Sequence, residues 1–239
     1  MFPLKDSVPA KHPPITLWIV IGLNCAAFLW QNAVALGNEE SPAWLDLAVV
    51  PSLVSWSDPS SWIPLLTSQF LHGGFVHLIS NLWMLWIFGD NVEDRMGPVR
   101  FGIFYLLCGV LAGVTHVAFD PSSPVPTIGA SGAIAGVLGA YLLLYPHSRV
   151  LTLVPVFFLP LVFDVPAVVF LVLWFGLQLL NGSLSLMTSD ALHSVAWWAH
   201  IGGFVAGLAL CRLFARRRLH PRALQLDEWT LEDLWRRMR

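Results

Sequence analysis

The sequence predicts an all-α membrane protein built as a bundle of six transmembrane helices. Of its 239 residues, 56% are hydrophobic and only 12% are charged, a balance that soluble domains do not show. A bilayer core of about 30 Å needs about 20 apolar residues in a helix that crosses it. Lysine and arginine are also missing from every second loop between the apolar segments, as expected for a multi-pass chain. The candidate spans are 15–36, 75–94, 99–119, 131–145, 165–182 and 195–214.

The segment before the first span, 1–14, is rich in proline and polar residues and lacks the continuous apolar core of a signal peptide. We expect it to be a cytoplasmic N-terminal segment, with 15–36 serving as the targeting signal. The long loop 37–74 carries apolar residues among polar ones. Parts of this loop are therefore expected to lie in the membrane interface as short helices.

The fourth span, 131–145, is short. At about 1.5 Å per residue it covers about 22 Å, well under the thickness of the hydrocarbon core. Its first residue, Ser131, would then lie several ångströms below the membrane surface. The preceding loop, 120–130, must dip into the membrane to meet it. Irregular backbone at that depth is tolerated only beside protein or a water-filled cavity.

The apolar segment 150–164 is ambiguous because Pro155 and Pro160 interrupt it. Counting it as a seventh span would place the basic cluster Arg212–Arg218 on the face that lacks basic residues. We therefore expect an interfacial or re-entrant connector, and a membrane domain that extends over 15–214.

The thirteen basic residues set the predicted orientation. Loops 37–74, 120–130 and 183–194 contain none of them, so both termini are expected to be cytoplasmic. The tail, 215–239, is predicted to form a cytoplasmic amphipathic helix on the membrane surface. The apolar face of this helix would consist of Leu231, Leu234, Trp235 and Met238.

Polar residues occur in the first turns of three spans that run in the same direction. They are His77 and Asn81 in 75–94, Ser131 in 131–145, and His200 in 195–214, so all four are expected at similar depth. Small residues follow both Ser131 and His200, and such pairs let helices approach closely. These small-residue pairs are Gly132 with Gly136 and Gly203 with Gly207.

A serine and a histidine in contact can perform hydrolysis. His200 would take the proton of Ser131 as the serine attacks a carbonyl, and would then deliver it to the leaving amine. The backbone N–H of Ser131 and the side chains of His77 and Asn81 are candidate donors to the developing oxyanion. The site halves of these spans contain no Asp or Glu, which favours a Ser-His dyad. Gln178, an isolated polar residue in the fifth span, is expected to make an interhelical hydrogen bond.

Other interpretations of these residues remain open. A membrane serine usually serves helix packing, His200 could line a proton path, and His77 and Asn81 could bridge helices. No H-E-x-x-H occurs and the three cysteines are scattered, so neither a metal nor another cofactor is expected. The net charge of −2 gives no indication of nucleic acid as a partner. A transporter would favour charged residues along a path, whereas Asp90, Glu93 and Asp94 cluster at one end of a span.

The motifs as a set resemble the three signatures of rhomboid intramembrane serine proteases. The matching segments are His72–His77 with Asn81, then Gly129–Gly132, then Ala199–Gly203, and the resemblance covers 15–214. It implies a rhomboid-like bundle without metal or cofactor that cleaves single-pass membrane proteins within or near their transmembrane helices. The lipid bilayer and transmembrane protein substrates are then the expected partners. The sequence does not indicate an oligomeric state.

By this resemblance, Ser131 is the nucleophile, His200 the base, and His77 and Asn81 the oxyanion stabilisers. The compact chain suits a bacterial plasma membrane. A non-proteolytic membrane scaffold or chaperone with the same fold is the alternative, although such a protein has no need to keep both Ser131 and His200.

The sequence departs from the family pattern at two places. Many relatives carry a Trp-Arg pair in the first outer loop, where this chain has Ile63 and Pro64, with Trp62 one place early. Some members have an aromatic residue four positions after the nucleophile that stacks on the histidine, and here that residue is Ala135. Other contacts must then orient His200, and the sequence does not name them.

Overall fold

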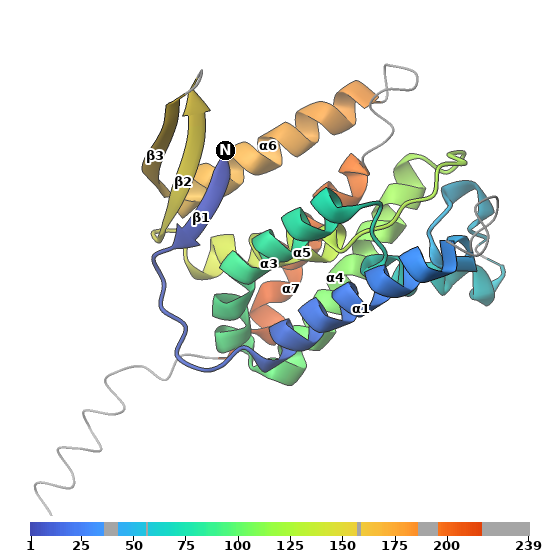
Figure 1. The fold of residues 1–239 in the computed structure, drawn as a ribbon, viewed down its shortest axis with the longest axis horizontal. Coiled ribbons are helices and arrows are strands. Elements are labelled where there is room, and N and C mark those ends of the chain that lie inside the picture. Colours follow the sequence, from blue (N-terminus) through green and yellow to red (C-terminus); the bar gives the residue numbers. More distant parts are fainter. Residues whose placement is uncertain (36–42, 56, 157–158, 186–195, 217–239) are drawn as a thin grey trace, which may run out of the picture.

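The computed structural model describes residues 1–35, 43–55, 57–156, 159–185 and 196–216, and its main feature is a bundle of long helices (Figure 1). Each long helix coincides with one of the predicted ranges to within three residues at either end. The long helices are α1 (Ile15–Ala35), α3 (Phe75–Met96), α4 (Pro98–Phe119), α5 (Ser131–Leu144), α6 (Ala167–Ser185) and α7 (Trp197–Phe214).

By length and composition, fewer of the long helices can cross a membrane than the bundle contains. Within the described ranges, α1, α4, α6 and α7 are long and apolar enough to cross a membrane. Helix α3 gives a fifth span if it is joined to Pro59–Phe70, from which it bends by 82°. Helix α5 is apolar but has only 14 residues. The chain is thus a multi-pass integral membrane protein, and the crossing by α5 stays a prediction.

Helix α5 lies at the centre of the bundle (Figure 1). Every residue from Gly132 to Tyr141 is buried, and α5 packs against α7, α4 and α3. The predicted glycine pairs meet each other, because a Cβ at Gly203 would overlap the carbonyl oxygen of Gly132. A Cβ at Gly207 would overlap the carbonyl oxygen of Gly136 in the same way. Backbone contact between α5 and α7 is therefore possible only because glycines occupy these positions.

The expectation of an all-α chain is wrong at one end of the bundle, which carries a three-stranded antiparallel sheet in the order β1-β2-β3 (Figure 1). Its strands are β1 (Phe2–Asp6), β2 (Arg149–Val156) and β3 (Leu159–Pro166). The segment predicted as a connector thus forms a hairpin, in which Arg149 pairs with Pro166. Hydropathy marked this segment as apolar, but a short apolar run does not by itself distinguish a strand from an interfacial segment.

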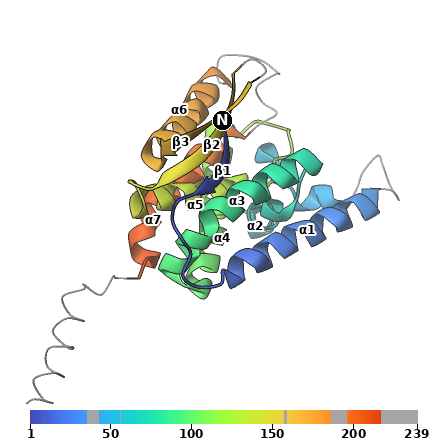
Figure 2. The same cartoon turned by 60° about the vertical axis from the view of Figure 1, so that its left-hand side comes forward.

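Strand β1 joins the N-terminal segment to the bundle. Trp83 Nε1 on α3 donates a hydrogen bond to the carbonyl oxygen of Pro3 at 2.6 Å. Asp6 Oδ2 accepts hydrogen bonds from the Tyr141 hydroxyl at 2.5 Å and from Asn91 Nδ2 at 2.9 Å. Burial raises the pKa of the Asp6 carboxyl above its ordinary value, although the Tyr141 hydrogen bond acts against this. Figure 2 shows the sheet between α6 and α3. We call this end of the molecule the sheet end.

The opposite end, which carries Ser131 and which we call the site end, is covered by short helices. As predicted, the described part of the loop before α3 forms such helices, and they contact the segment that leads to α5. Val49 and Thr127 form an isolated antiparallel bridge, with N–H to O distances of 3.0 and 2.7 Å. Gly129 N–H donates to Ser68 O at 2.9 Å. The helices are η1 (Ala43–Leu47), η2 (Pro51–Leu53), η3 (Pro59–Trp62), α2 (Pro64–Thr67) and η4 (Ser68–Phe70). The amphipathic helix predicted in the tail lies outside the described residues.

Candidate active site

Ser131 and His200 are in hydrogen-bond contact. Ser131 is the first residue of α5, and His200 lies in the first turn of α7. The distance between Ser131 Oγ and His200 Nε2 is 2.8 Å, the usual distance for a hydroxyl hydrogen bond. The glycine contact between the two helices begins one residue after Ser131 and brings the two first turns together. The structure therefore places the predicted nucleophile and base next to each other.

Gln178 supplies the orienting contact that the sequence could not name. Its Oε1 lies 2.8 Å from His200 Nδ1. An amide oxygen accepts hydrogen bonds, so Nδ1 carries the proton in this arrangement and Nε2 is left free to accept the hydroxyl proton of Ser131. The sequence signal was present, because Gln178 is a polar residue with apolar neighbours on both sides in an apolar span. The identity of its partner depends on which face of α6 meets α7, which the sequence does not show.

Two tryptophans surround His200 where Ala135 provides no ring. Trp174 on α6 lies with its ring centroid 6.0 Å from that of His200, in a tilted arrangement. Trp197 on α7 meets His200 edge to face at 6.1 Å. The aromatic environment of the histidine is thus contributed by α6 and α7 instead of α5.

His77 faces the segment just before the serine. Gly73 N–H donates to His77 Nδ1 at 3.3 Å, so Nδ1 is an acceptor and the proton of a neutral ring is on Nε2. A Cβ at Gly129 would lie 2.8 Å from His77 Nε2, and Gly129 has a φ of +128°. Only glycine suits this position, both for its backbone conformation and for the room that the imidazole requires. His77 Nε2 thereby lies against Gly129, two residues before α5 begins.

Two further kinds of donor lie at the same place. Asn81 is buried, and its Nδ2 has no hydrogen-bond partner among the described residues. No side chain caps α5, so the N–H groups of Ser131 and Gly132 have no acceptor within the helix and carry the partial positive charge of a helix N-terminus. An oxygen atom that gains negative charge next to Ser131 would find these donors already in position.

These groups line one cavity of about 490 Å³. At about 30 Å³ per molecule, this volume admits on the order of ten waters or an extended stretch of peptide. Polar side chains on its wall suit a hydrated space, in contrast to the lipid-facing surface of the bundle. The cavity is lined by, among others, Ser68, Gln69, His77, Asn81, Thr127, Ser131 and His200.

Two other histidines stand apart from the dyad. The ring of His72 is buried 5.1 Å from the ring of His77, outside the residues that line the cavity. His116 Nε2 lies 3.0 Å from Thr127 Oγ1 and so ties the loop before Ser131 to α4. In the described part of the chain, no three His, Cys, Asp or Glu residues are grouped so as to hold a metal ion.

Comparison with known proteins identifies the family of this chain. The model of the Rhomboid domain family matches residues 59–217. The chain is 33% identical over 135 residues to Rhomboid protease GluP of Bacillus subtilis (strain 168), a match that covers 56% of this chain and 24% of the relative.

Two mitochondrial proteins are also similar. Rhomboid protein 1, mitochondrial, of Saccharomyces cerevisiae is 28% identical over 148 residues, which is 60% of this chain and 40% of the relative. Presenilin-associated rhomboid-like protein, mitochondrial, of Homo sapiens is 28% identical over 163 residues, which is 64% of this chain and 38% of the relative. The chain thus spans less than half the length of each of these relatives. Since the Rhomboid domain model covers well over half of this chain and includes Ser131 and His200, the protein belongs to the rhomboid family.

Proposed function

We propose that this protein is an intramembrane serine endopeptidase that works through the dyad of Ser131 and His200. The observation that carries the proposal is the 2.8 Å contact between Ser131 Oγ and His200 Nε2 at the wall of a cavity that other polar side chains also line, next to donors that have no acceptor of their own. A serine that served packing alone would have no use for a histidine held in the tautomer that accepts its proton.

The first half of the reaction forms an acyl-enzyme. His200 Nε2 takes the proton from the Ser131 hydroxyl as Oγ attacks the carbonyl carbon of a peptide bond. The carbonyl oxygen becomes negatively charged, and the N–H of Ser131, the amide of Asn81 and Nε2–H of His77 donate to it. When the carbon to nitrogen bond breaks, His200 delivers its proton to the leaving amine.

The second half releases the acyl group. A water molecule from the cavity loses a proton to His200 and attacks the ester carbon, and the same donors stabilise the oxyanion again. The bond to Ser131 Oγ then breaks, and Oγ takes the proton back from His200. Each turnover consumes one water and restores both side chains.

The family membership and the location of the cavity support transmembrane proteins as substrates. A helix hides its carbonyl groups in its own hydrogen bonds, so the segment that is cut must unwind before it reaches Ser131. Cleavage within or near a single transmembrane helix, close to small or helix-breaking residues, fits this requirement.

Our proposal includes a location and an orientation. Described basic residues occur in β1, before α1, at the end of α3, the start of α4, the start of β2 and after the middle of α7, and so at the helix ends away from Ser131. With the positive-inside rule, the sheet end and both termini are then cytoplasmic, in a bacterial plasma membrane. The residues in question are Lys5, Lys11, Arg95, Arg100, Arg149, Arg212 and Arg216.

The test is cleavage of a model single-pass substrate by the purified protein in detergent. We expect Ser131→Ala and His200→Ala each to abolish cleavage and to prevent labelling of the protein by a fluorophosphonate, since both reactions need the activated hydroxyl. Ser131→Ala removes only one oxygen atom, so thermal unfolding of this variant should be almost unchanged.

Matched controls are Ser183→Ala and His147→Ala, which alter exposed residues away from the cavity and should retain activity. Cleavage that survives in Ser131→Ala would remove the proposed mechanism. A wild-type protein that binds the substrate, does not cut it and does not react with the fluorophosphonate would favour the scaffold or chaperone instead.

A further inference from the structure

Helix α6 carries one amide within the stripe of side chains that it buries. The stripe recurs every three, four or seven residues and is otherwise composed of apolar or small residues. Its members are Ala167, Phe170, Leu171, Gln178, Gly182 and Ser185. A buried amide lowers stability unless it finds hydrogen-bond partners, so a leucine would serve packing at position 178 better. The partners that Gln178 finds therefore indicate its role.

Both ends of the Gln178 amide are engaged. Oε1 accepts from His200 Nδ1 at 2.8 Å, while Nε2 donates to the carbonyl oxygen of Trp174 on its own helix at 3.4 Å. Rotating the amide by half a turn would place a donor against Nδ1 and an acceptor against a carbonyl. The bond to the helix backbone thus favours the orientation in which the oxygen faces the histidine.

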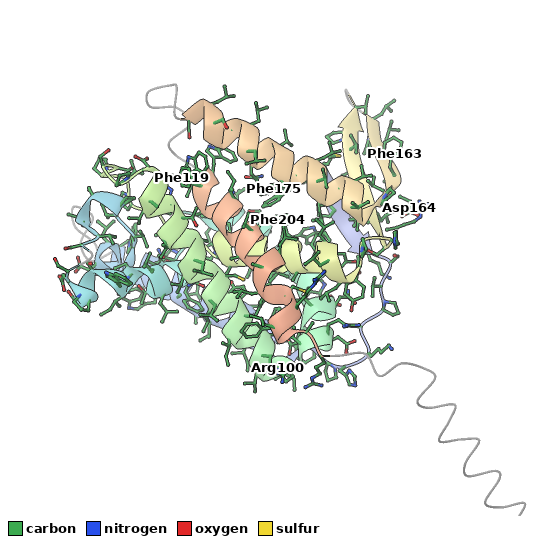
Figure 3. The ribbon with its side chains drawn as sticks, turned by 180° about the vertical axis from the view of Figure 1, so that it is seen from behind. Arg100, Phe119, Phe163, Asp164, Phe175 and Phe204 are labelled. Atoms are coloured by element: carbon green, nitrogen blue, oxygen red, sulfur yellow. The ribbon has the colours of Figure 1, made fainter. Side chains whose placement is uncertain are left out.

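Packing of α6 on α7 holds this contact in place. The rings of Phe175 and Phe204 are stacked with centroids 4.5 Å apart, and Figure 3 shows both side chains between the two helices. Trp174 also approaches Phe204 at 6.0 Å. The amide therefore reaches His200 from a helix face that other side chains fix in position.

We propose that Gln178 is a positioning residue that holds His200 in the tautomer with a proton on Nδ1, so that the Nε2 lone pair points at Ser131. This inference rests on the proposed function and extends it, because it turns the dyad into a line of three side chains from α5, α7 and α6. In the other tautomer, Nε2 carries hydrogen and cannot accept the serine proton. The acceptor is a neutral amide, whereas serine hydrolases with a triad use a carboxylate.

The kinetic test replaces Gln178 with leucine and with glutamate. Gln178→Leu keeps the size and removes the acceptor, and we expect kcat to fall about tenfold to a hundredfold with little change in KM, since a hydrogen bond to the histidine is lost as it becomes charged. Gln178→Glu keeps an acceptor and should restore most of kcat. Because a carboxylate stabilises the protonated imidazole more than an amide does, the acid limb of the pH profile should move to higher pH.

The matched control is Asn32→Leu on α1. Asn32 Nδ2 bonds the carbonyl of Phe28, also four residues earlier, but Asn32 does not line the catalytic cavity. This variant should keep the wild-type kcat and pH profile. Unchanged kcat in Gln178→Leu, or equal losses in Gln178→Leu and Gln178→Glu with no shift of the acid limb, would overturn the proposal.

A second measurement does not depend on turnover. With histidine labelled by ¹⁵N, the signals of His200, assigned by their loss in His200→Ala, report which ring nitrogen carries the proton. We expect Nδ1 to be protonated in the wild type and the two tautomers to mix in Gln178→Leu. The same tautomer populations in both proteins would overturn the role of Gln178. If the wild type cleaves nothing but the signals change as expected, the positioning holds and the proposed function fails.

Discussion

Single residues define the chemistry of this site because each is polar in a setting where polar groups are costly. Ser131 and His200 use each other as hydrogen-bond partners, and Gln178 occupies the remaining nitrogen of the imidazole. Asn81 differs from them, since its amide nitrogen is buried without a partner. An unpaired buried donor costs about 1–3 kcal/mol, so its presence calls for an explanation. An oxyanion that forms only during the reaction would be the missing acceptor and would explain the unpaired donor.

Asn81→Ala tests this explanation. We expect kcat to fall by up to about a hundredfold, as for loss of one oxyanion donor, with a much smaller change in KM. The folded protein should not lose stability from the missing amide, because the amide nitrogen makes no hydrogen bond in the resting state. Substrate kinetics together with thermal unfolding measure both effects.

Asn32→Ala is the matched change outside the cavity and should leave kcat unaltered. A rise in KM as large as the fall in kcat in Asn81→Ala, or a large drop in the unfolding temperature, would indicate that Asn81 bridges helices instead.

The sequence predicts the residues of the site better than the contacts that orient them. Ser131, His200, His77 and Asn81 stand out because each lies in the first turns of an apolar span, where glycines follow or precede it. Gln178 stands out equally as a polar residue. Its role depends on the packing of α6 against α7, which is a relation between distant segments that no local pattern records.

At the scale of elements, the short α5 and the sheet deserve separate explanations. Helix α5 is buried along most of its length by close approach of α7, so its stability comes from contacts with neighbours and not from its own length. The sheet depends on the N-terminal segment for one of its three strands. Asp6 is the point where this strand meets α3 and α5 through Asn91 and Tyr141.

The raised pKa of Asp6 predicts how the stability of this junction depends on pH. Because the pKa of the folded state lies above the ordinary value, folding favours the protonated carboxyl. The contribution of the protonated Asp6 carboxyl to the stability of the folded state is fully present below the ordinary pKa and is lost as the pH rises through the raised pKa. Asp6→Asn stays neutral and can still accept from Tyr141. We therefore expect the variant to melt at a higher temperature than the wild type at pH 7 and the difference to vanish near pH 4.

Asp58 gives a comparison of opposite sign. Its carboxylate accepts from the hydroxyl and the N–H of Ser60, which lowers its pKa. Asp58→Asn should melt slightly below the wild type at pH 7, with a difference that shrinks as the pH falls through the lowered value. Thermal unfolding followed by tryptophan fluorescence measures both series. If the melting temperatures of Asp6→Asn and the wild type differ by the same amount at every pH, the raised pKa of Asp6 is contradicted.

The helices were predictable and the sheet was not, for one physical reason. An apolar run of about 20 residues has a single stable form in a bilayer, because its backbone groups must pair within the segment. A run of eight residues such as Arg149–Val156 can pair in several ways. Its actual partners, β1 and β3, lie on opposite sides of it in the sequence, and β1 is far away along the chain.

For the whole molecule, the number of membrane crossings depends on whether α5 crosses the bilayer. The six-span prediction requires α5 to cross despite its 14 residues. Single cysteines introduced at exposed positions on either side of α5, in a protein without Cys25, Cys108 and Cys211, can be labelled from one face of a membrane vesicle with an impermeant maleimide. We expect Ser122→Cys and His147→Cys to react from opposite faces.

Ser57→Cys lies in the loop before α3 and should react from the same face as Ser122→Cys. Labelling of positions 122 and 147 from one face would show that α5 does not cross, and it would also remove the assignment of both termini to the same compartment. Retained cleavage by each cysteine variant is the check that the fold is intact.

The pairing of β1 with β2 also sets an order of events during synthesis. Ser7 and Arg149, which are 142 positions apart, exchange hydrogen bonds of 2.9 Å through Arg149 N–H to Ser7 Oγ and Ser7 N–H to Arg149 O. A ribosome that adds about 5–20 residues per second needs roughly 7–30 s to produce the second partner after the first. During that interval the earliest part of the chain has no strand to join. Its docking is thus a late step of biogenesis that follows the translation of α5 and of Ser131 at its start.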